Sequence, residues 1–372
     1  MKRILSVLLT LVLVLALAPA AMADGSLSGI KIGILGYQQS GEPVTAINNF
    51  MTAMHEATGI EFIYVCGSSY DEQTNLTHVQ NMLSSGCNGI IICMDTAMEA
   101  IIEECEMADV FVAGFLCDFE RSMDMLKTHP NFVGTVCDGP YDNTVYGTHM
   151  AKLVIADGRK NVGLLTSPYR YYPHKQEAVE AFVKAIDEYN ATAEEKIVVS
   201  EVEELAFRAL DATYFANHPD IDCIVSFSAG TFVYPTMISE GRTDLCMYAV
   251  GFESEEAFLD NMRKGVCGLQ TYSNEEAVIY PLVLLINAIQ GNRYADQPAE
   301  AERVDSSVVF VSTPEEIEAV MTKSFYLNPV FENSFLTTDQ IKDLILSYNP
   351  NATYADLVAP LTRMGIEDIM AK

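Results

Sequence analysis

The sequence is poor in basic residues. Its 372 residues contain 22 lysines and arginines against 51 aspartates and glutamates, a formal net charge of −29 at pH 7. This excess of negative charge opposes binding to phosphate backbones and to anionic lipid surfaces. We therefore exclude nucleic acid as a partner.

The cysteines lack the spacing of disulfide frameworks or metal sites. There are nine, an odd number, with no C-x-x-C pair and no Cys/His cluster at zinc-ligand spacing. Five lie in or beside strand-like apolar runs, namely Cys66, Cys93, Cys223, Cys246 and Cys267. Because a free cysteine behaves as a small buried hydrophobe, we expect mostly free, buried thiols and no bound metal.

No apolar run is long enough for a comfortable transmembrane helix, but the first one has the pattern of a secretory signal. Two basic residues precede the run Ile4–Leu17, and Ala21-Met22-Ala23 supplies a small-x-small cleavage site. We expect residues 1–23 to be a signal peptide and the mature chain to be exported. No cysteine precedes Cys66, so no lipid-attachment site follows the signal.

Enzyme signatures are incomplete or missing. Ser226-Phe227-Ser228-Ala229-Gly230 approaches G-x-S-x-G, but serine replaces the first glycine and no histidine partner stands out. The sequence has no G-x-G-x-x-G and no P-loop motif, and no spacing pairs two carboxylates for acid–base work. We expect no catalytic residue and no cofactor. A secreted hydrolase that uses Ser228 is kept as an alternative.

What the sequence has is an alternation of short apolar strands with amphipathic helices. The first run has strands at 31–35, 61–65, 89–93, 110–115 and 132–136, and helices at 44–57, 72–83 and 98–107. The second run has strands at 161–165, 196–199, 223–227 and 247–250, and helices at 146–155, 177–189, 205–216 and 255–264. Continuous apolar strands between helices predict an α/β protein with two doubly wound parallel-sheet lobes.

Later segments complicate an end-to-end arrangement. Residues 266–271 and 308–311 read as further strands, and 275–289 as a buried helix. The tail from Phe325 to Lys372 has a helical pattern, and we expect it to pack against one lobe.

Ligands of open α/β sheets bind at the carboxyl ends of the strands. The side chains that follow the predicted strands are Tyr37, Gln38, Ser68, Ser69, Asp95 and Asp118 in the first lobe and Asp138, Tyr169, Arg170, Ser228 and Glu253 in the second. The set is rich in hydrogen-bonding groups and aromatic rings, which suits a neutral polyol. Asp95 and Asp118 would each accept hydroxyl hydrogen bonds.

The loop Ser167–Lys175 is the most unusual stretch. It places three tyrosines, including Tyr172, with an arginine and a lysine between a strand and a helix. Tyrosine offers a flat apolar face with a polar tip, which suits a sugar ring. Since tryptophan is absent, stacking on a ligand must come from tyrosine or phenylalanine.

Over about residues 29–325 the sequence resembles the type I periplasmic binding proteins, particularly the sugar-binding branch. The segments that carry the resemblance are Ser85–Ile92, Val136–Gly139, His218–Ile224, Val250–Glu253 and Met262–Gly265. The resemblance implies a three-stranded hinge between lobes, with crossings near Cys137/Asp138, Gln270/Thr271 and Ser312/Thr313. The N-terminal lobe would then be 24–137 plus 271–312, the C-terminal lobe 138–270 plus 313–325, and 326–372 a helical extension.

The resemblance also implies ligand-binding positions. Tyr37 holds the usual aromatic position, Asp95 and Asp118 match polar positions, and Thr271 lies at a crossing. Ser228 stands where many relatives have Asn, and Glu253 where many have Asp. Ala178 replaces an arginine common in relatives, and Arg170 or Lys175 would substitute for it.

The function implied is that of a monomeric solute-binding protein of an ABC importer. It would close its hinge around a small polar molecule, a sugar first, and deliver it to a membrane permease. A ligand-sensing subunit for a membrane kinase or chemoreceptor remains open, because it would use the same site. A cationic solute and a nucleoside remain alternative ligands. The fold is shared with sugar-responsive repressors, but the signal peptide and the acidic charge oppose that role.

Overall fold

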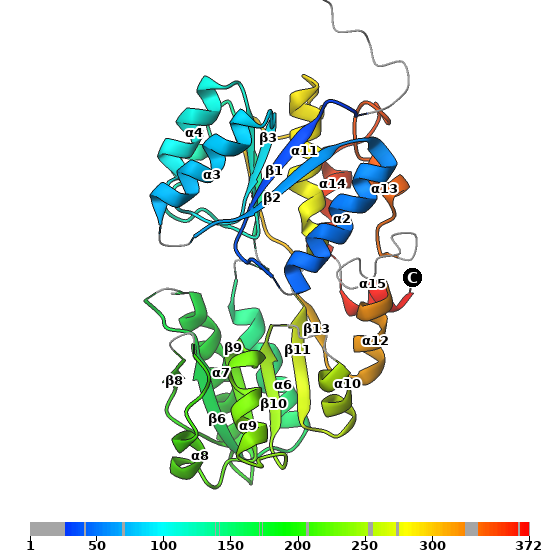
Figure 1. Cartoon of the computed structure of the whole chain (residues 1–372). Coiled ribbons are helices and arrows are strands. Elements are labelled where there is room, and N and C mark those ends of the chain that lie inside the picture. The colour runs from blue at the N-terminus through cyan, green and yellow to red at the C-terminus, as the bar shows by residue number, and fades with distance from the viewer. Residues whose placement is uncertain are drawn as a thin grey trace, which may run out of the picture.

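The computed structural model describes residues 27–40, 42–68, 71–137, 139–140, 142–170, 172, 174–205, 208–251, 256–272, 275–323, 334–363 and 365–371. The expected signal peptide and three of the side chains named at strand ends, Ser69, Asp138 and Glu253, lie outside this set. The chain forms two α/β lobes (Figure 1), each built on its own sheet. The doubly wound fold class predicted from the sequence is confirmed.

The N-terminal lobe contains a six-stranded parallel sheet in the order β12-β5-β4-β3-β1-β2. Its strands are β1 (Lys31–Gly36), β2 (Glu61–Cys66), β3 (Gly89–Ile92), β4 (Phe111–Phe115), β5 (Phe132–Val136) and β12 (Arg303–Val304). Helices α2 (Glu42–Thr58) and α11 (Ile279–Ile289) belong to one core, and α3 (Glu72–Ser84) and α4 (Met98–Met107) to another, while α5 (Met123–Leu126) is a single turn. Every residue of β3 is buried because both faces of the sheet are covered.

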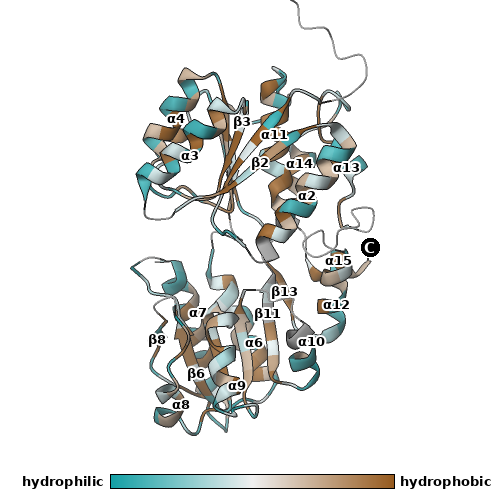
Figure 2. Ribbon diagram, in the orientation of Figure 1, coloured by the Kyte–Doolittle hydropathy of each residue, from teal (hydrophilic) through white to brown (hydrophobic). Residues whose placement is uncertain are grey.

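The C-terminal lobe contains a second sheet in the order β13-β11-β10-β9-β6-β7, with β8 beside the end of β6. Its strands are β6 (Asn161–Thr166), β7 (Val198–Val199), β8 (Glu203–Glu204), β9 (Cys223–Ala229), β10 (Cys246–Val250), β11 (Cys267–Tyr272) and β13 (Val309–Val311). Its helices are α6 (Thr144–Ala156), α7 (His174–Thr192), α8 (Thr213–Asn217), α9 (Tyr234–Ser239), α10 (Glu256–Arg263) and α12 (Pro314–Lys323). Figure 2 shows the apolar strands lying inside more polar helices in both lobes.

Two sequence-based assignments are wrong in this lobe. The helix predicted at 205–216 is reduced to α8, because Leu205 and Leu210 bury themselves from irregular backbone. The strand at 308–311 was assigned to the N-terminal lobe, but β13 pairs antiparallel with β11, Thr271 lying opposite Phe310. The third crossing between lobes therefore falls between Val304 and Val309, before the predicted Ser312/Thr313.

The C-terminal tail packs against both lobes, not one as expected. Helices α13 (Thr338–Lys342) and α14 (Tyr354–Arg363) contact α2 and α11 of the N-terminal lobe, and α15 (Ile366–Ala371) contacts α12 and β13 of the C-terminal lobe.

All nine cysteines are free and eight are buried, Cys66 being half-buried, as the sequence predicted.

The tail should contribute to stability as core. Leu357 of α14 is fully buried in the main core of the N-terminal lobe. We expect Leu357→Ala to lower the free energy of unfolding by about 2–5 kcal/mol, through lost burial and the cavity left behind. Urea unfolding measures this, with the exposed Val198→Ala as control at about 0.5 kcal/mol or less. Equal effects of the two substitutions on the free energy of unfolding would show that α14 does not contribute to the core of the lobe.

Candidate functional site

The carboxyl ends of the two sheets face each other across the segments that join the lobes (Figure 1). The first and third crossings are bonded side by side. The Ser306 hydroxyl donates to the Cys137 carbonyl at 2.7 Å and accepts from the Gly139 N–H at 2.8 Å, and the Cys137 N–H donates to the Val304 carbonyl at 2.8 Å. The loops after the strands therefore lie on both sides of the hinge, where the sequence analysis expected a ligand.

Asp95 follows β3, but its carboxylate is already bonded within the N-terminal lobe. It accepts hydrogen bonds from the Arg121 N–H at 2.8 Å and from the Ser122 hydroxyl, and the Arg121 guanidinium lies 3.7 Å away and bonds to the Asp95 carbonyl. The Asp95 side chain is 12% exposed, and that of Arg121 is 77% exposed. Asp95 therefore positions the β4–α5 loop and Arg121, two roles that sequence reasoning missed.

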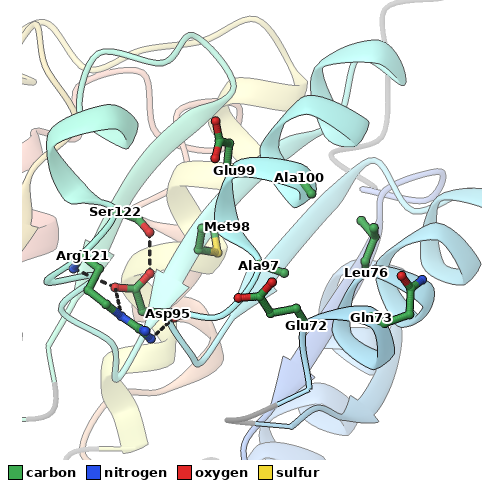
Figure 3. A pocket seen from close by; sticks show the side chains of 10 residues that line it. All are labelled: Glu72, Gln73, Leu76, Asp95, Ala97, Met98, Glu99, Ala100, Arg121 and Ser122. Carbon is green, nitrogen blue, oxygen red and sulfur yellow. Dashed lines mark hydrogen bonds and ion pairs between the residues drawn. The ribbon is translucent and has the colours of Figure 1, made fainter.

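Beside Asp95 lies a cavity of about 360 Å³, entirely within the N-terminal lobe (Figure 3). Its lining comes from the β3–α4 loop, from the starts of α3 and α4 and from the β4–α5 loop, and comprises Glu72, Gln73, Leu76, Asp95, Ala97, Met98, Glu99, Ala100, Arg121 and Ser122. Glu72 and Glu99 are drawn on opposite sides of it, so carboxylates, an amide and one guanidinium offer both donors and acceptors. Such mixed polarity fits a neutral, hydroxyl-rich ligand edge.

Tyr37, Gln38 and Asp118 occupy the other N-terminal-lobe loops. Tyr37 is 39% exposed. The backbone carbonyl of Gln38 accepts a hydrogen bond from the Tyr64 hydroxyl at 2.7 Å, which fixes the loop after β1. The Asp118 carboxylate accepts from the Glu120 N–H at 3.2 Å and turns its own loop. Tyr37 and Gln38 are exposed and Asp118 is half-buried, and all three follow strands of the first sheet.

The loop after β6 divides its aromatic residues between core and surface. Tyr169 packs against the core of the C-terminal lobe, where burial and the carboxylates of Glu204 and Glu180 raise its pKa. Arg170 is exposed, and Tyr172 is 40% exposed with its ring edge-on to His174 at 5.9 Å. Tyr172 and Arg170 therefore remain candidate ligand contacts, and Tyr169 serves chiefly as a support.

The position of the missing arginine has a structural explanation. Ala178 is fully buried between α7 and α6, and a Cβ added at Gly147 would lie 2.0 Å from the Ala178 carbonyl oxygen. This close helix contact leaves no room for an arginine. Of the two cations suggested as substitutes, Lys175 places its Nζ 5.2 Å from the ring centroid of Tyr146. Arg170 is the more exposed of the two.

Buried hydroxyls line the carboxyl edge of the second sheet. The Ser167 hydroxyl bonds to the Ser228 hydroxyl at 3.2 Å, and the Thr271 hydroxyl accepts from the Gly251 N–H at 3.0 Å. Thr166 Oγ1 is buried and has no hydrogen-bond partner among the described residues. Ser228 is bonded to serines, with no base among its described partners, so the hydrolase alternative gains no support.

The described residues contain no group of three or more His, Cys, Asp or Glu side chains arranged to hold a metal ion. None of the helices in the described ranges is long and apolar enough to cross a membrane.

The pKa of His174, at the start of α7, is influenced by a carboxylate of the opposite lobe. Burial lowers its pKa to about 4, with help from Lys175, and the Asp118 carboxylate of the N-terminal lobe opposes this shift. The folded pKa thus lies below the ordinary 6.5, so between pH 6.5 and 4 the unfolded chain binds more protons than the folded one. His174 therefore contributes a fall in the free energy of unfolding as the pH is lowered through this window.

We expect His174→Gln to flatten the dependence of stability on pH between about 6.5 and 4. Denaturant unfolding at four pH values measures the slope. His78→Gln, a partly exposed histidine on α3, serves as control and should keep the wild-type slope. A slope unchanged in His174→Gln would mean that His174 is not held neutral by its surroundings.

Comparisons with known proteins identify the fold. No family model and no curated protein sequence matches the chain. Solved structures do match. A sugar ABC transport substrate-binding protein from Bordetella parapertussis superposes with a TM-score of 0.59 at 11% identity, over 82% of this chain and 95% of that one.

Two further structures match equally well. A periplasmic solute-binding protein from Actinobacillus succinogenes with bound D-allose has a TM-score of 0.58 at 16% identity, over 78% and 99% of the two chains. A periplasmic ribose ABC transporter protein from Conexibacter woesei has a TM-score of 0.57 at 15% identity, over 81% and 97%. The chain thus has the two-lobed fold of the type I periplasmic binding proteins, as its sequence suggested.

Proposed function

We propose that the chain is an exported solute-binding protein of an ABC importer, which binds a sugar between its lobes and does no chemistry on it. The observation that carries the proposal is the pairing of two carboxyl sheet edges across a bonded hinge, both rich in hydroxyl, amide and aromatic groups. Structures with this fold include one with bound D-allose. The signal-peptide pattern of residues 1–23 supports export.

The arrangement around Asp95 supports a neutral ligand over a cationic one. The Asp95 carboxylate offers little to a cationic solute, because its charge is met by Arg121 and by one N–H and one O–H donor. A neutral polyol instead uses mixed donors and acceptors, with rings for its apolar faces. Tyr37 in one lobe and Tyr172 in the other, both exposed, offer such rings from opposite sides.

Binding would proceed by closure of the lobes. A ligand that contacts both loops stabilises the closed arrangement through bonds absent in the separated one, which shifts the population of hinge angles. The closed, loaded monomer would then be presented to a membrane permease. A sensing role would use the same closed state, and the membrane protein bound by it distinguishes the two.

A thermal melt of residues 24–372 against D-ribose, D-allose, D-galactose and D-arabinose, with nucleosides, amino acids and polyamines, tests the ligand class. A bound ligand at about a thousand times its dissociation constant adds ~4 kcal/mol and raises the Tm by several degrees. We expect a shift with at least one sugar and none with polyamines. A shift with polyamines alone would contradict the assignment of a sugar.

The same ligand then tests the two tyrosines. We expect Tyr37→Ala and Tyr172→Ala each to weaken binding of that sugar about fivefold, because each loses a ring face worth ~1 kcal/mol. Isothermal titration measures the dissociation constants. Met107→Ala, at an exposed side chain on the far end of α4, is the control and should bind as the wild type does. Unchanged affinity in both tyrosine variants would remove them from the site.

A further inference from the structure

The chain crosses between the lobes more often than a three-segment hinge requires. After the crossings that follow β5, β11 and β12, it runs from α12 in the C-terminal lobe to α13 and α14 in the N-terminal lobe, and returns to the C-terminal lobe with α15. We call the described residues 334–363 and 365–371 the C-terminal strap. In Figure 1 the strap lies to one side of the connecting segments, outside the space between the facing sheet edges.

The strap is anchored firmly in the N-terminal lobe. Asp296 accepts the Tyr354 N–H at 2.7 Å and the Ala355 N–H at 3.1 Å, which satisfies the first turn of α14. The Tyr354 hydroxyl lies 2.7 Å from that of Tyr280, and both side chains are buried. Because α14 completes the core of this lobe, it moves with the lobe as one body.

The strap is also bonded to the third crossing. The N–H and the hydroxyl of Ser307 both donate to the Leu361 carbonyl, at 2.8 and 3.0 Å. Ser307 lies between β12 and β13, so this bond ties the last turn of α14 to a hinge segment. A change of hinge angle must carry α14 along or break this contact.

In the C-terminal lobe, α15 is held by the buried Ile369, by the partly buried Ile366 and by one long-range bond. Ile369 is fully buried in a cluster with Val309, Val311 and Ile317. The Lys323 Nζ donates to the Met370 carbonyl at 3.0 Å. The end of the strap is therefore docked on the lobe opposite to the one that holds α14.

The cluster around Ile369 contains a residue of the other lobe. Ala46, in the first half of α2, is fully buried in the same cluster. The lobes thus share an apolar cluster beside the hinge, to which one lobe contributes Ala46 of α2 and the other contributes residues of α10, β11, α12, β13 and α15. An apolar contact of this kind loses burial if the lobes rotate, so it favours one interlobe angle.

We propose that the C-terminal strap is a hinge restraint, in which α15 and the apolar cluster that contains Ala46 hold the lobes at the interlobe angle of this structure. A ligand that closes the lobes must displace this contact, so the strap sets how much binding energy closure consumes. The restraint acts in the unliganded protein and does not depend on which molecule binds. Its effect on affinity rests on the proposed sugar-binding function.

The restraint is tested by the distribution of interlobe distances in residues 24–372 without ligand. Spin labels carried by unnatural amino acids at Glu103 on α4 and Glu188 on α7, both exposed, avoid the nine native cysteines, and pulsed electron resonance gives the distribution. We compare Ile369→Ala, a chain ending at Gly365, and the control Met370→Ala, whose side chain on the same helix is 44% exposed.

We expect the width of the distribution to roughly double in Ile369→Ala and in the shortened chain, with new population at shorter distances, and to stay unchanged in Met370→Ala. Circular dichroism shows whether each variant is folded. The shortened chain lacks α15 and keeps α14, so it tests the restraint even if Ile369→Ala unfolds α15. Folded variants with the wild-type distribution would overturn the proposal, as would equal broadening in the control. A sugar found by the thermal melt should bind Ile369→Ala and the shortened chain severalfold more tightly. If no sugar binds, the distance measurement still decides the restraint.

Discussion

The hydrogen bonds that hold the crossing segments together are the constraint on which the rest of this structure depends. Ser306 bridges the Cys137 carbonyl and the Gly139 N–H, and β13 adds to β11 as an antiparallel strand directly beside the second crossing. These contacts bring segments more than 160 residues apart in sequence into one bundle. They fix which ends of the two sheets face each other, and so decide where a ligand site can form.

Some side chains of the candidate site hold its loops in place, and others remain exposed to solvent. Asp95, Tyr169 and Thr271 are bonded or packed within their own lobes, so they shape the loops. Tyr37 and Tyr172 stay open to solvent on opposite lobes. The effect of Asp118 on the pKa of His174 is felt across the hinge, which places these two loops within electrostatic reach of each other. A small polar ligand between them would meet rings and hydroxyls from both lobes.

Much of the fold was predictable because parallel strands buried on both faces have a strong sequence signal. Runs such as Gly89–Ile92 admit few other interpretations, and the helices between them followed. The sequence signal failed where apolar residues are buried from irregular backbone and where a strand could pair with either sheet. Residues 205–216 carry a helical pattern of apolar residues, yet their leucines enter the core from loops. The three residues of β13 could pair with either sheet. The sheet that β13 joins depends on whether the chain crosses to the C-terminal lobe before or after it.

The residues named at strand ends lie at the carboxyl edges of the sheets, and their roles in binding stay predictions. Of their contacts, the partner of Asp95 lies 26 residues away on another loop, where no spacing rule points to it. The position of the C-terminal tail was the hardest feature to predict, because the sequence of a short amphipathic helix does not indicate which lobe it covers.

Small-angle X-ray scattering of residues 24–372 tests the central claim, that the lobes close around a sugar. The radius of gyration is measured alone and with each of D-ribose, D-allose, D-galactose and D-arabinose at millimolar concentration. The account predicts a smaller radius with at least one of them, since closure brings the lobes together. An unchanged radius with every sugar, in a protein that is folded and monomeric, would contradict it.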